Sequence, residues 1–494
     1  MVNRSQKTGR CHLLIRGGRI IDGTGGPGFT GDLAIEGDRI AAVGDLSEWR
    51  ADAVVDAAGL VDAAGLVVAP GFIDVHIHDD LAVIDDPGHE AKVSQGVTTV
   101  IGGNCGVSLA PLVPPGKLHQ LFGLLGEDAA FRYPTLTSYR DAVDKAKPAV
   151  NIALFVGHTT LRAEAMDGDF ERPAPEAERM AMAERLREAM GEGALGLSTG
   201  LDYPPARQAP TEEIIDLARE LKGFPDAVYV SHIRNEGEHV LEAVDETFEI
   251  GRAASCMAVV SHHKCAGKAN YGRSRETLAR IEKASQDQPV GLDLYPYRAS
   301  STVLAMERVR GADSVIVTGS DRHPEVAGRR LDAIARSWRC SEEEAVKRLH
   351  PAGAVYFSMD EADVERIMAY DKTMIGSDGL PSMDHPHPRL WGTFPRVLGH
   401  YVRERGIISL EQAIHKMTGL SAETFGLHGR GVLASGNAAD IVVFDPQTVR
   451  DKATFEAPRQ RSEGIALVFV AGRPVWDKAG PTAERPGGFL SRSL

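Results

Sequence analysis

Short apolar runs alternate with amphipathic segments over most of the chain. Between residues 72 and 379 the runs are 72–78, 98–104, 151–158, 194–200, 227–233, 257–263, 290–296 and 373–379. In the segments 175–190, 211–223 and 239–254, apolar residues recur every three or four positions, which predicts amphipathic helices. Strands that are apolar on both faces and alternate with helices predict a parallel sheet. Eight such units predict a closed (β/α)₈ TIM-like barrel.

The two ends of the chain have a different pattern. Residues 13–23 and 32–44 each contain a strand signal, a glycine-containing turn and a second strand signal, and short strands return in 431–446 and 464–476. We therefore expect residues 1–70 and 431–494 to form one small, discontinuous β-sandwich or β-barrel domain beside a barrel of residues 71–430. The stretch 297–354 is too long for a simple crossover and predicts an inserted lid or pocket wall.

Composition and charge narrow the classes of function. The chain has 494 residues, of which 43% are apolar and 25% charged, as in an ordinary globular protein. The formal net charge of −14 comes without a basic stripe, so we expect no nucleic-acid partner. We expect no membrane span, because no window approaches about 20 apolar residues. Five cysteines, an odd number, fit a reducing compartment, so we expect a cytoplasmic protein.

Candidate chemistry collects where the predicted strands end. A TIM-like barrel places its active site at those carboxyl ends. The residues at these ends that are able to bind a metal are His76, His78, Cys105, His232, His262 and Asp378. A single histidine at a strand end is more often a hydrogen-bonded core residue, and we expect that role for His158. Six such residues at the ends of five predicted strands instead indicate a metal site.

Imidazole, thiolate and carboxylate ligands together suit zinc, which in catalytic sites keeps a position open for water. Two metals are possible if one ligand bridges them, and the thiolate of Cys105 is the candidate bridge. Zinc lowers the pKa of bound water from 15.7 toward about 7 and polarises an amide carbonyl.

At this point the sequence resembles a known family, the N-acyl-D-amino-acid deacylases (D-aminoacylases) of the amidohydrolase superfamily. The resemblance covers nearly the whole chain. It is carried by GFIDVHIHDD, GGNCG, GLSTGLDYPP, VSHIRNEG, SHHK, IGSDGLP, HPHPRLWGTFPRVLGHY and GNAADIVVFDP. It implies zinc-dependent hydrolysis of N-acyl-D-amino acids to a carboxylate and a free D-amino acid. The preference for D substrates rests on this resemblance alone.

The resemblance also implies the ligand sets. A tightly held zinc is expected on Cys105, His232 and His262, and a second, weaker site on His76, His78, Cys105 and Asp378. Many amidohydrolases bridge their metals with a carboxylated lysine in the fourth strand, but the run 194–200 has none, and Cys105 fills that place. In SHHK the ligand corresponds to His262, so His263 is expected to lie behind it.

Asp378 is the candidate general base and acid. It is expected to take the proton from the attacking water and deliver it to the departing nitrogen. Without the other ligands, the SDG sequence around it is equally typical of a turn.

The substrate's α-carboxylate requires a cation. Lys264 and Arg389 lie beside the metal loops, with a solvated surface charge as the alternative for each. Tyr295 is a candidate hydroxyl donor, although packing is an equal alternative for it.

The resemblance suggests that Tyr203, Tyr356 and Met359 line the cleft, which favours apolar D side chains. We expect surface positions for Arg298 and Arg310, with selection of acidic D side chains by one of these cations as the alternative.

Two other functions compete with the deacylase. A cyclic-amide hydrolase of the hydantoinase or dihydroorotase type would use the same metal chemistry, but the cysteine in place of the lysine argues against it. A scaffold that kept the barrel and lost catalysis should have lost ligands, yet all six candidates are present. We expect a small-molecule substrate as the partner, and a monomer or a small homo-oligomer.

Overall fold

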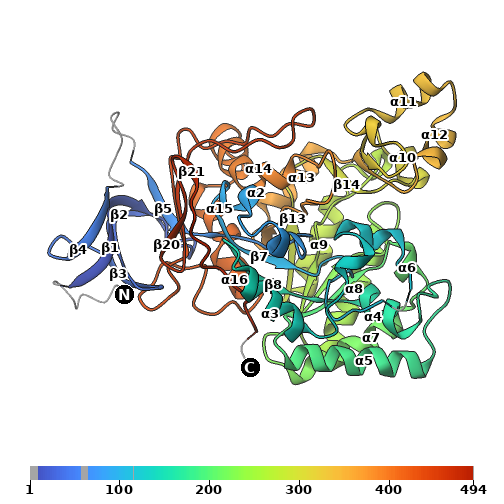
Figure 1. Ribbon diagram of the computed structural model, residues 1–494, viewed down its shortest axis with the longest axis horizontal. Coiled ribbons are helices and arrows are strands. Elements are labelled where there is room, and N and C mark those ends of the chain that lie inside the picture. The colour runs from blue at the N-terminus through green and yellow to red at the C-terminus, as the bar shows by residue number, and fades with distance from the viewer. Residues whose placement is uncertain (1–8, 57–64, 115, 493–494) are drawn as a thin grey trace.

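The computed structural model describes residues 9–56, 65–114 and 116–492. A sheet built from both ends of the chain forms one end of the molecule, an α/β body occupies the centre, and a small helical and β unit projects at the far side (Figure 1).

The α/β body is TIM-barrel-like. Its strands are β6 (Phe72–Asp74), β7 (Val97–Gly102), β8 (Asn151–Leu154), β9 (Val156–Gly157), β10 (Gly196–Gly200), β11 (Val228–His232), β12 (Met257–Val260), β13 (Val290–Leu294) and β17 (Thr373–Ile375). All pairings among them are parallel. Nearly every residue in these strands is buried, as expected for a sheet covered by helices on one face and filled by side chains on the other.

The eight predicted runs all contain strands, and the three predicted helices are present. They are α5 (Glu176–Gly191), α7 (Thr211–Ala218) and α8 (Val240–Ala254), with α3 (Leu136–Ala146), α4 (His158–Ala165), α9 (Ser274–Ala284), α13 (Glu361–Ala369) and α15 (Leu410–Met417) between or after other strands.

The predicted closed barrel differs from the structure in one respect, because the strand ladder is not continuous. Within the described residues, the strands form a six-stranded sheet from β9 to β17 and a three-stranded sheet of β6, β7 and β8. Phe155 separates β8, which pairs with β7, from β9, which pairs with β10. At the other junction, the backbone N–H of Asp378 donates to the carbonyl of His76 (2.7 Å), and Ile77 pairs with Gly379.

The terminal sheet draws strands from both ends of the chain. Its strands are β1 (Arg10–Ile20), β2 (Phe29–Glu36), β3 (Arg39–Gly44), β4 (Arg50–Asp56), β5 (Val67–Pro70), β18 (Ile441–Phe444), β19 (Ile465–Val470), β20 (Arg473–Asp477) and β21 (Gly480–Pro481). The two parts of the chain meet where β5 pairs antiparallel with β18.

One predicted turn in this sheet is wrong. Residues 13–23 do not form a hairpin, because β1 runs unbroken from Arg10 to Ile20 and pairs with β2 along its length. Gly17 and Gly18 instead mark a shift of register, with Gly17 at a φ of 63°. Glycine at a positive φ is typical of a β-bulge as well as of a turn. The second predicted hairpin, β2 and β3, is present.

The predicted insert is a unit with its own core. It contains β14 (Ala299–Val303), α10 (Met306–Gly311), β15 (Ser314–Ser320), α11 (Leu331–Trp338), α12 (Glu342–Leu349) and β16 (Ala352–Phe357). The three strands form an antiparallel sheet in the order β14–β16–β15. Figure 1 shows it extending away from the centre of the molecule, with α11 and α12 outermost.

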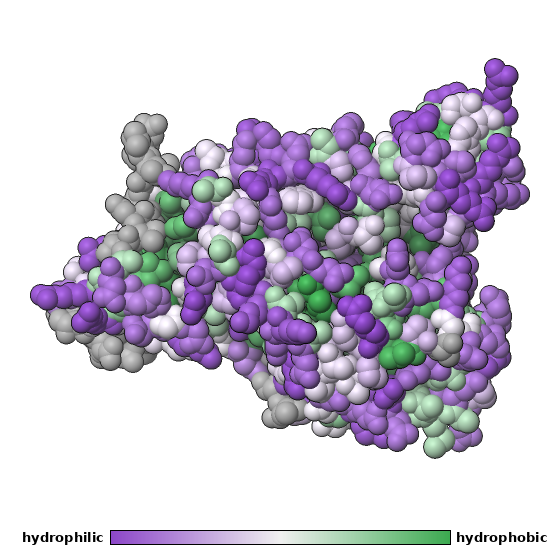
Figure 2. All heavy atoms as spheres, in the orientation of Figure 1, coloured by the Kyte–Doolittle hydropathy of each residue, from purple (hydrophilic) through white to green (hydrophobic). Residues whose placement is uncertain are grey.

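The face shown in Figure 2 is covered mainly by hydrophilic side chains, with apolar residues visible in small areas between them. Among the described helices, none has the length and apolar character needed to cross a bilayer.

Candidate metal and active site

The candidate site forms on the loops that follow the parallel strands. His76 and His78 follow β6, Cys105 follows β7, and His232 is the last residue of β11. The expected strand 72–78 is shorter than predicted, so the two histidines belong to the loop after it. Three of the site residues have left-handed backbone: Cys105 (φ 53°), His262 (φ 34°) and Asp378 (φ 50°). Such conformations cost free energy and cluster at functional sites.

The thiol of Cys105 lies at the centre of the site. Its Sγ is 3.3 Å from His76 Nε2, 3.6 Å from His232 Nδ1 and 3.3 Å from His262 Nε2. The loop that carries it packs closely on β10, because a Cβ on Gly200 would lie 2.2 Å from the carbonyl oxygen of Cys105. Glycine at position 200 therefore permits the approach that brings the sulfur to the centre.

Asp378 completes the opposite side of the site. Its Oδ1 lies 3.1 Å from His78 Nε2 and 3.8 Å from His76 Nε2. The carboxylate is buried, which by itself would raise its pKa. The neighbouring Arg389 guanidinium and His78 outweigh this effect and hold the pKa of Asp378 far below its ordinary value.

These donors fit a transition metal. Two groups have ligand atoms within 4.8 Å of one another: His76, His78 and Cys105 in the first, and Cys105, His232 and His262 in the second. Burial would raise the pKa of the Cys105 thiol, but His76 and the hydrogen bond with His232 lower that pKa well below its ordinary value. A thiolate shared between two histidine groups could bridge a pair of zinc ions.

The predicted carboxylate-binding residues surround this centre. Arg389 is fully buried, and its Nη1 lies 2.9 Å from Asp378 Oδ2. The Lys264 Nζ and the Arg389 guanidinium lie 5.5 and 4.4 Å from the centroid of the Tyr295 ring. The Tyr295 hydroxyl is buried without a hydrogen-bond partner in the described structure.

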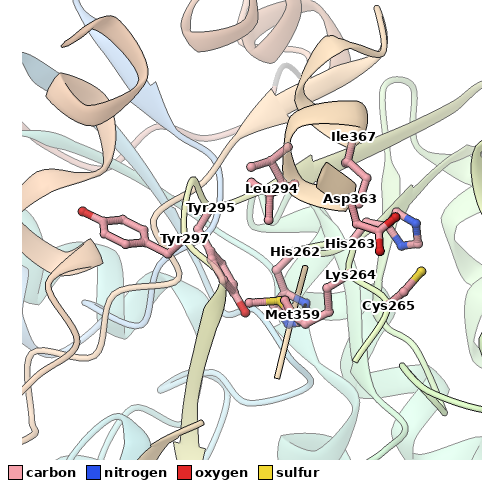
Figure 3. Close-up of a pocket in the computed structure, with 11 residues that line it drawn as sticks. His262, His263, Lys264, Cys265, Leu294, Tyr295, Tyr297, Met359, Asp363 and Ile367 are labelled. Carbon is pink, nitrogen blue, oxygen red and sulfur yellow. Dashed lines mark hydrogen bonds between the residues drawn. The ribbon is translucent and has the colours of Figure 1, made fainter. Parts of the chain in front are cut away.

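The residues expected to line the cleft separate into two groups. The Tyr203 ring contacts His232 (centroids 4.7 Å apart), and Met359 lines a cavity with His262 and Lys264 (Figure 3). The structure does not bring Tyr356 to the cluster. Its ring packs in the core of the insert, and its hydroxyl donates to Val303 O (2.9 Å) and accepts from Ala305 N. Tyr356 and Met359 are close in the sequence, and their spacing alone did not indicate that the two side chains have different surroundings.

The two additional histidines have other partners. His263 lies 2.7 Å from the Thr277 hydroxyl and points away from His262 (Figure 3). His158 Nε2 lies 3.1 Å from Glu213 in a buried cluster with Arg162. Both placements agree with the roles expected from the sequence.

The insert carries a third arginine, Arg308, whose contacts differ from those of Arg298 and Arg310. Those two side chains are exposed. Arg308 is instead largely buried, makes an ion pair with Asp202 and lies over the Tyr203 ring at 5.8 Å. Arg308 and Arg310 both lie in α10, and which of them contacts the site depends on the face of this helix that meets the rim.

Three buried acidic residues near the site were missed. Asp293 Oδ1 lies 3.5 Å from His76 Nδ1 and accepts from the backbone N–H of His262 (2.9 Å). Asp74 accepts from Lys92 and from the backbone N–H of Ser377, which joins the ends of β6 and β17. Glu236 contacts Lys264 and two of the histidines. The available signal was a charged residue inside an apolar run for Asp293 and a spacing of four from His232 for Glu236.

A barrel rim that joins nitrogen, sulfur and carboxylate donors is typical of a metal-dependent hydrolase. The amidohydrolase family model matches residues 59–319 and 325–476. D-aminoacylase from Alcaligenes xylosoxydans xylosoxydans is 51% identical over 97% of this chain and 98% of its own. A D-aminoacylase structure described by its binuclear metal centre, with one-metal activation and second-metal attenuation, is 49% identical (TM-score 0.92) and covers 98% of this chain and 100% of its own.

A third similar protein carries a ligand. The structure of N-acyl-D-glutamate deacylase from Bordetella bronchiseptica, complexed with zinc and a phosphonate mimic of the tetrahedral intermediate, is 47% identical. It covers 98% of this chain and 100% of its own, with a TM-score of 0.93. The chain therefore belongs to the amidohydrolase family and, within it, to the N-acyl-D-amino-acid deacylases (D-aminoacylases).

Proposed function

We propose that this chain is a zinc-dependent hydrolase that cleaves the amide bond of N-acyl-D-amino acids, giving a carboxylate and a free D-amino acid. The observation that carries the proposal is the position of the Cys105 sulfur, within 3.6 Å of imidazole nitrogens from the ends of three different strands. The similarity to D-aminoacylase and to a zinc complex of N-acyl-D-glutamate deacylase supports the same chemistry.

The residues divide into two metal sites. Cys105, His232 and His262 would hold the tightly bound zinc, and His76, His78, Cys105 and Asp378 a second, weaker one. The relative described by one-metal activation and second-metal attenuation supports this inequality. The chemistry supplied by zinc is Lewis acidity, which polarises the amide carbonyl and makes water acidic enough to lose a proton near neutral pH.

The protein's own groups supply the proton transfer. Asp378 lies at the edge of the metal ligands and is ionised, so it accepts the proton of the attacking water. The same carboxyl then donates that proton to the amide nitrogen as the bond breaks, which lets the amine leave as a neutral group.

Lys264, Tyr295 and Arg389 would bind the α-carboxylate of the substrate. This assignment is supported by their convergence on one ring and by the unpartnered Tyr295 hydroxyl. Tyr203 and Met359 supply apolar lining beside the metal ligands, whereas Tyr356 supports this wall from inside the insert. Arg308 adds a cation to the same wall, so we propose that it sets the balance between acidic and apolar D side chains.

The predicted domain division stays part of the proposal. Residues 71–430 would act as one (β/α)₈ barrel with an insert at about 297–354, and residues 1–70 and 431–494 as the small β domain. The pairing of β5 with β18 supports a discontinuous domain. A cytoplasmic location and a monomeric or small homo-oligomeric state also stay predictions, and the five free cysteines support a reducing compartment.

A hydrolysis panel tests the function. N-acetyl-D-methionine, N-acetyl-D-leucine and N-acetyl-D-glutamate are compared with their L forms, and zinc per chain is measured in the same preparation. We expect release of free D-amino acid with about one tightly held zinc per chain. Predominant turnover of the L forms, or full activity in zinc-free protein, would refute the proposal.

A further inference from the structure

Glu236 is a buried carboxylate that faces two of the candidate zinc ligands at once. It lies in the loop after β11, and only 7% of its surface is exposed. Its Oε1 is 3.5 Å from His232 Nε2 and 3.4 Å from His262 Nδ1. Within the described part of the chain, no other carboxylate lies within 4.0 Å of both rings.

The two histidines present opposite nitrogens to this carboxylate. His232 directs Nδ1 to the Cys105 sulfur and Nε2 to Glu236, whereas His262 directs Nε2 to the sulfur and Nδ1 to Glu236. A neutral imidazole carries one N–H and one lone pair. Neither contact with Glu236 is a hydrogen bond, and His232 Nε2 has no hydrogen-bond partner in the described structure. The negative charge of the carboxylate still favours a proton on the nitrogen that faces it, which leaves each lone pair on the nitrogen that faces the sulfur and the metal position.

The loop that carries Glu236 is fixed at both sides. The backbone carbonyl of Glu236 accepts from the N–H of Ala266 (2.6 Å), in the loop after β12. The side chain of Asn235 accepts from the backbone N–H groups of Gly237 and His239. The carboxylate is therefore held between the loops that carry the two histidines, rather than on a freely moving side chain.

Lys264 competes for one of the same nitrogens. Its Nζ lies 2.8 Å from His262 Nδ1, and an ammonium at that distance favours a lone pair on Nδ1, which would place the N–H on the nitrogen that faces the sulfur. Glu236 also accepts from the Lys264 ammonium at 2.5 Å. The carboxylate thus opposes the effect of Lys264 on His262 while it holds Lys264 beside the site.

We infer that Glu236 is a positioning residue, which selects the zinc-binding tautomers of His232 and His262 together and so determines the affinity of the tight zinc site. The inference rests on the proposed zinc-dependent function. It extends that function, because Glu236 touches neither the metal position nor the substrate, and acts through the two rings. Partners of this kind around metal-binding histidines change affinity by roughly 10- to 100-fold when removed.

The test is zinc affinity, measured by competition with a chromophoric chelator at neutral pH. Glu236→Gln keeps the shape and removes the charge, and we expect it to bind zinc roughly 10- to 100-fold more weakly than the wild type. Glu236→Asp, which keeps a carboxylate, should recover part of the loss. The melting temperature of each zinc-free protein shows whether the fold itself is changed.

Two controls separate the mechanism from alternatives. Glu246→Gln breaks an ion pair with Arg234 away from the metal ligands and should leave zinc affinity within about twofold of the wild type, the scatter expected of a substitution without effect. Lys264→Met removes a cation beside His262, so it should leave zinc affinity unchanged or raise it. If Glu236 acted only by neutralising Lys264, the variant with both substitutions would bind zinc like the wild type, which would overturn the inference.

Unaltered zinc affinity in Glu236→Gln also overturns the inference. That outcome differs from failure of the proposed function, in which the wild-type protein itself would hold no zinc or cleave no N-acyl-D-amino acid. A variant whose zinc-free melting temperature falls by many degrees is replaced by Glu236→Asp. The aspartate side chain is shorter by one C–C bond, so its oxygens lie about 1.5 Å farther from the two rings. Full zinc affinity in Glu236→Asp would then contradict the inference.

Discussion

The guanidinium of Arg389 lies 2.9 Å from the carboxylate of Asp378, and both side chains are buried. The two groups have different proposed tasks, because one binds the substrate's carboxylate and the other transfers a proton. Arg389 also donates to the backbone carbonyl of Ser301 in the insert (3.1 Å). The arginine thus links the insert to Asp378, the proposed proton carrier.

Arg389→Lys should weaken substrate binding, because lysine keeps the charge and loses the planar pair of donors. A hydrogen bond to a charged group contributes about 1.5–3 kcal/mol, so we expect the KM for an N-acyl-D-amino acid to rise roughly 10- to 100-fold. Zinc content should stay at the wild-type value. Steady-state kinetics with zinc analysis check this, and an unchanged KM would remove Arg389 from the substrate site.

Asp378→Asn should retain the tightly held zinc and lose turnover. General acid and base catalysis contributes roughly 10²- to 10⁴-fold, so kcat should fall by that factor. Asp384→Asn, an exposed carboxylate six residues further along, is the matched control and should keep wild-type kcat. Full turnover by Asp378→Asn would show that another group carries the proton.

Cys105→Ser should abolish tight zinc binding, because a serine hydroxyl stays protonated where the thiol of Cys105 is held ionised. We expect zinc to fall well below one per chain after dialysis, with kcat falling in proportion. Cys340→Ser, in the insert, is the control for replacing a cysteine as such. Wild-type zinc content and rate in Cys105→Ser would exclude the bridging role.

The sequence predicted the elements better than the contacts between them. Buried parallel strands are continuous apolar runs, so all eight were found, whereas the paired glycines at 17 and 18 suit a turn and a bulge equally. His76 and Cys105 were recognisable because they end strands of a barrel. Glu236 and Arg308 were not, since their importance depends on which loops meet at the rim. Contacts between these loops are tertiary contacts, and the spacing of residues within one segment does not predict them.

Arg308→Ala should change the choice of side chain. Arg308 lies beside Tyr203, and its removal leaves Asp202 with the longer contact to Arg207 (3.8 Å), so that the wall becomes less favourable to acidic substrates. We expect the ratio of kcat/KM for N-acetyl-D-glutamate to that for N-acetyl-D-leucine to fall about 10-fold or more, from the loss of a charge-assisted hydrogen bond. Arg310→Ala, which removes an exposed arginine of the same helix, should leave the ratio unchanged. If Arg308→Ala and Arg310→Ala had the same ratio of kcat/KM values, the D side chain of the substrate would not bind beside Arg308.

Acid sensitivity should arise in part from Glu213, far from the metal ligands. Burial would raise the pKa of this carboxyl, but the hydrogen bond with His158, the N–H of Ala174 and the charge of Arg162 lower the pKa to about 2. In the unfolded chain a glutamate has a pKa of about 4.3. The folded state therefore binds this proton less readily. Its stabilising contribution is complete above about pH 4.5 and is lost as the pH falls toward 2.

Glu213→Gln should remove that dependence and lower stability at neutral pH. The shift in pKa corresponds to a few kcal/mol, on the order of 3, and the substitution also leaves Arg162 buried without its carboxylate. Urea unfolding at pH 7, 5 and 4 measures the difference in free energy between wild type and variant, which should be nearly equal at pH 7 and pH 5 and smaller at pH 4. Glu212→Gln, one residue earlier and exposed, is the control and should match the wild type at each pH. A difference between wild type and Glu213→Gln that stays constant with pH would show that Glu213 titrates alike in the folded and unfolded chains.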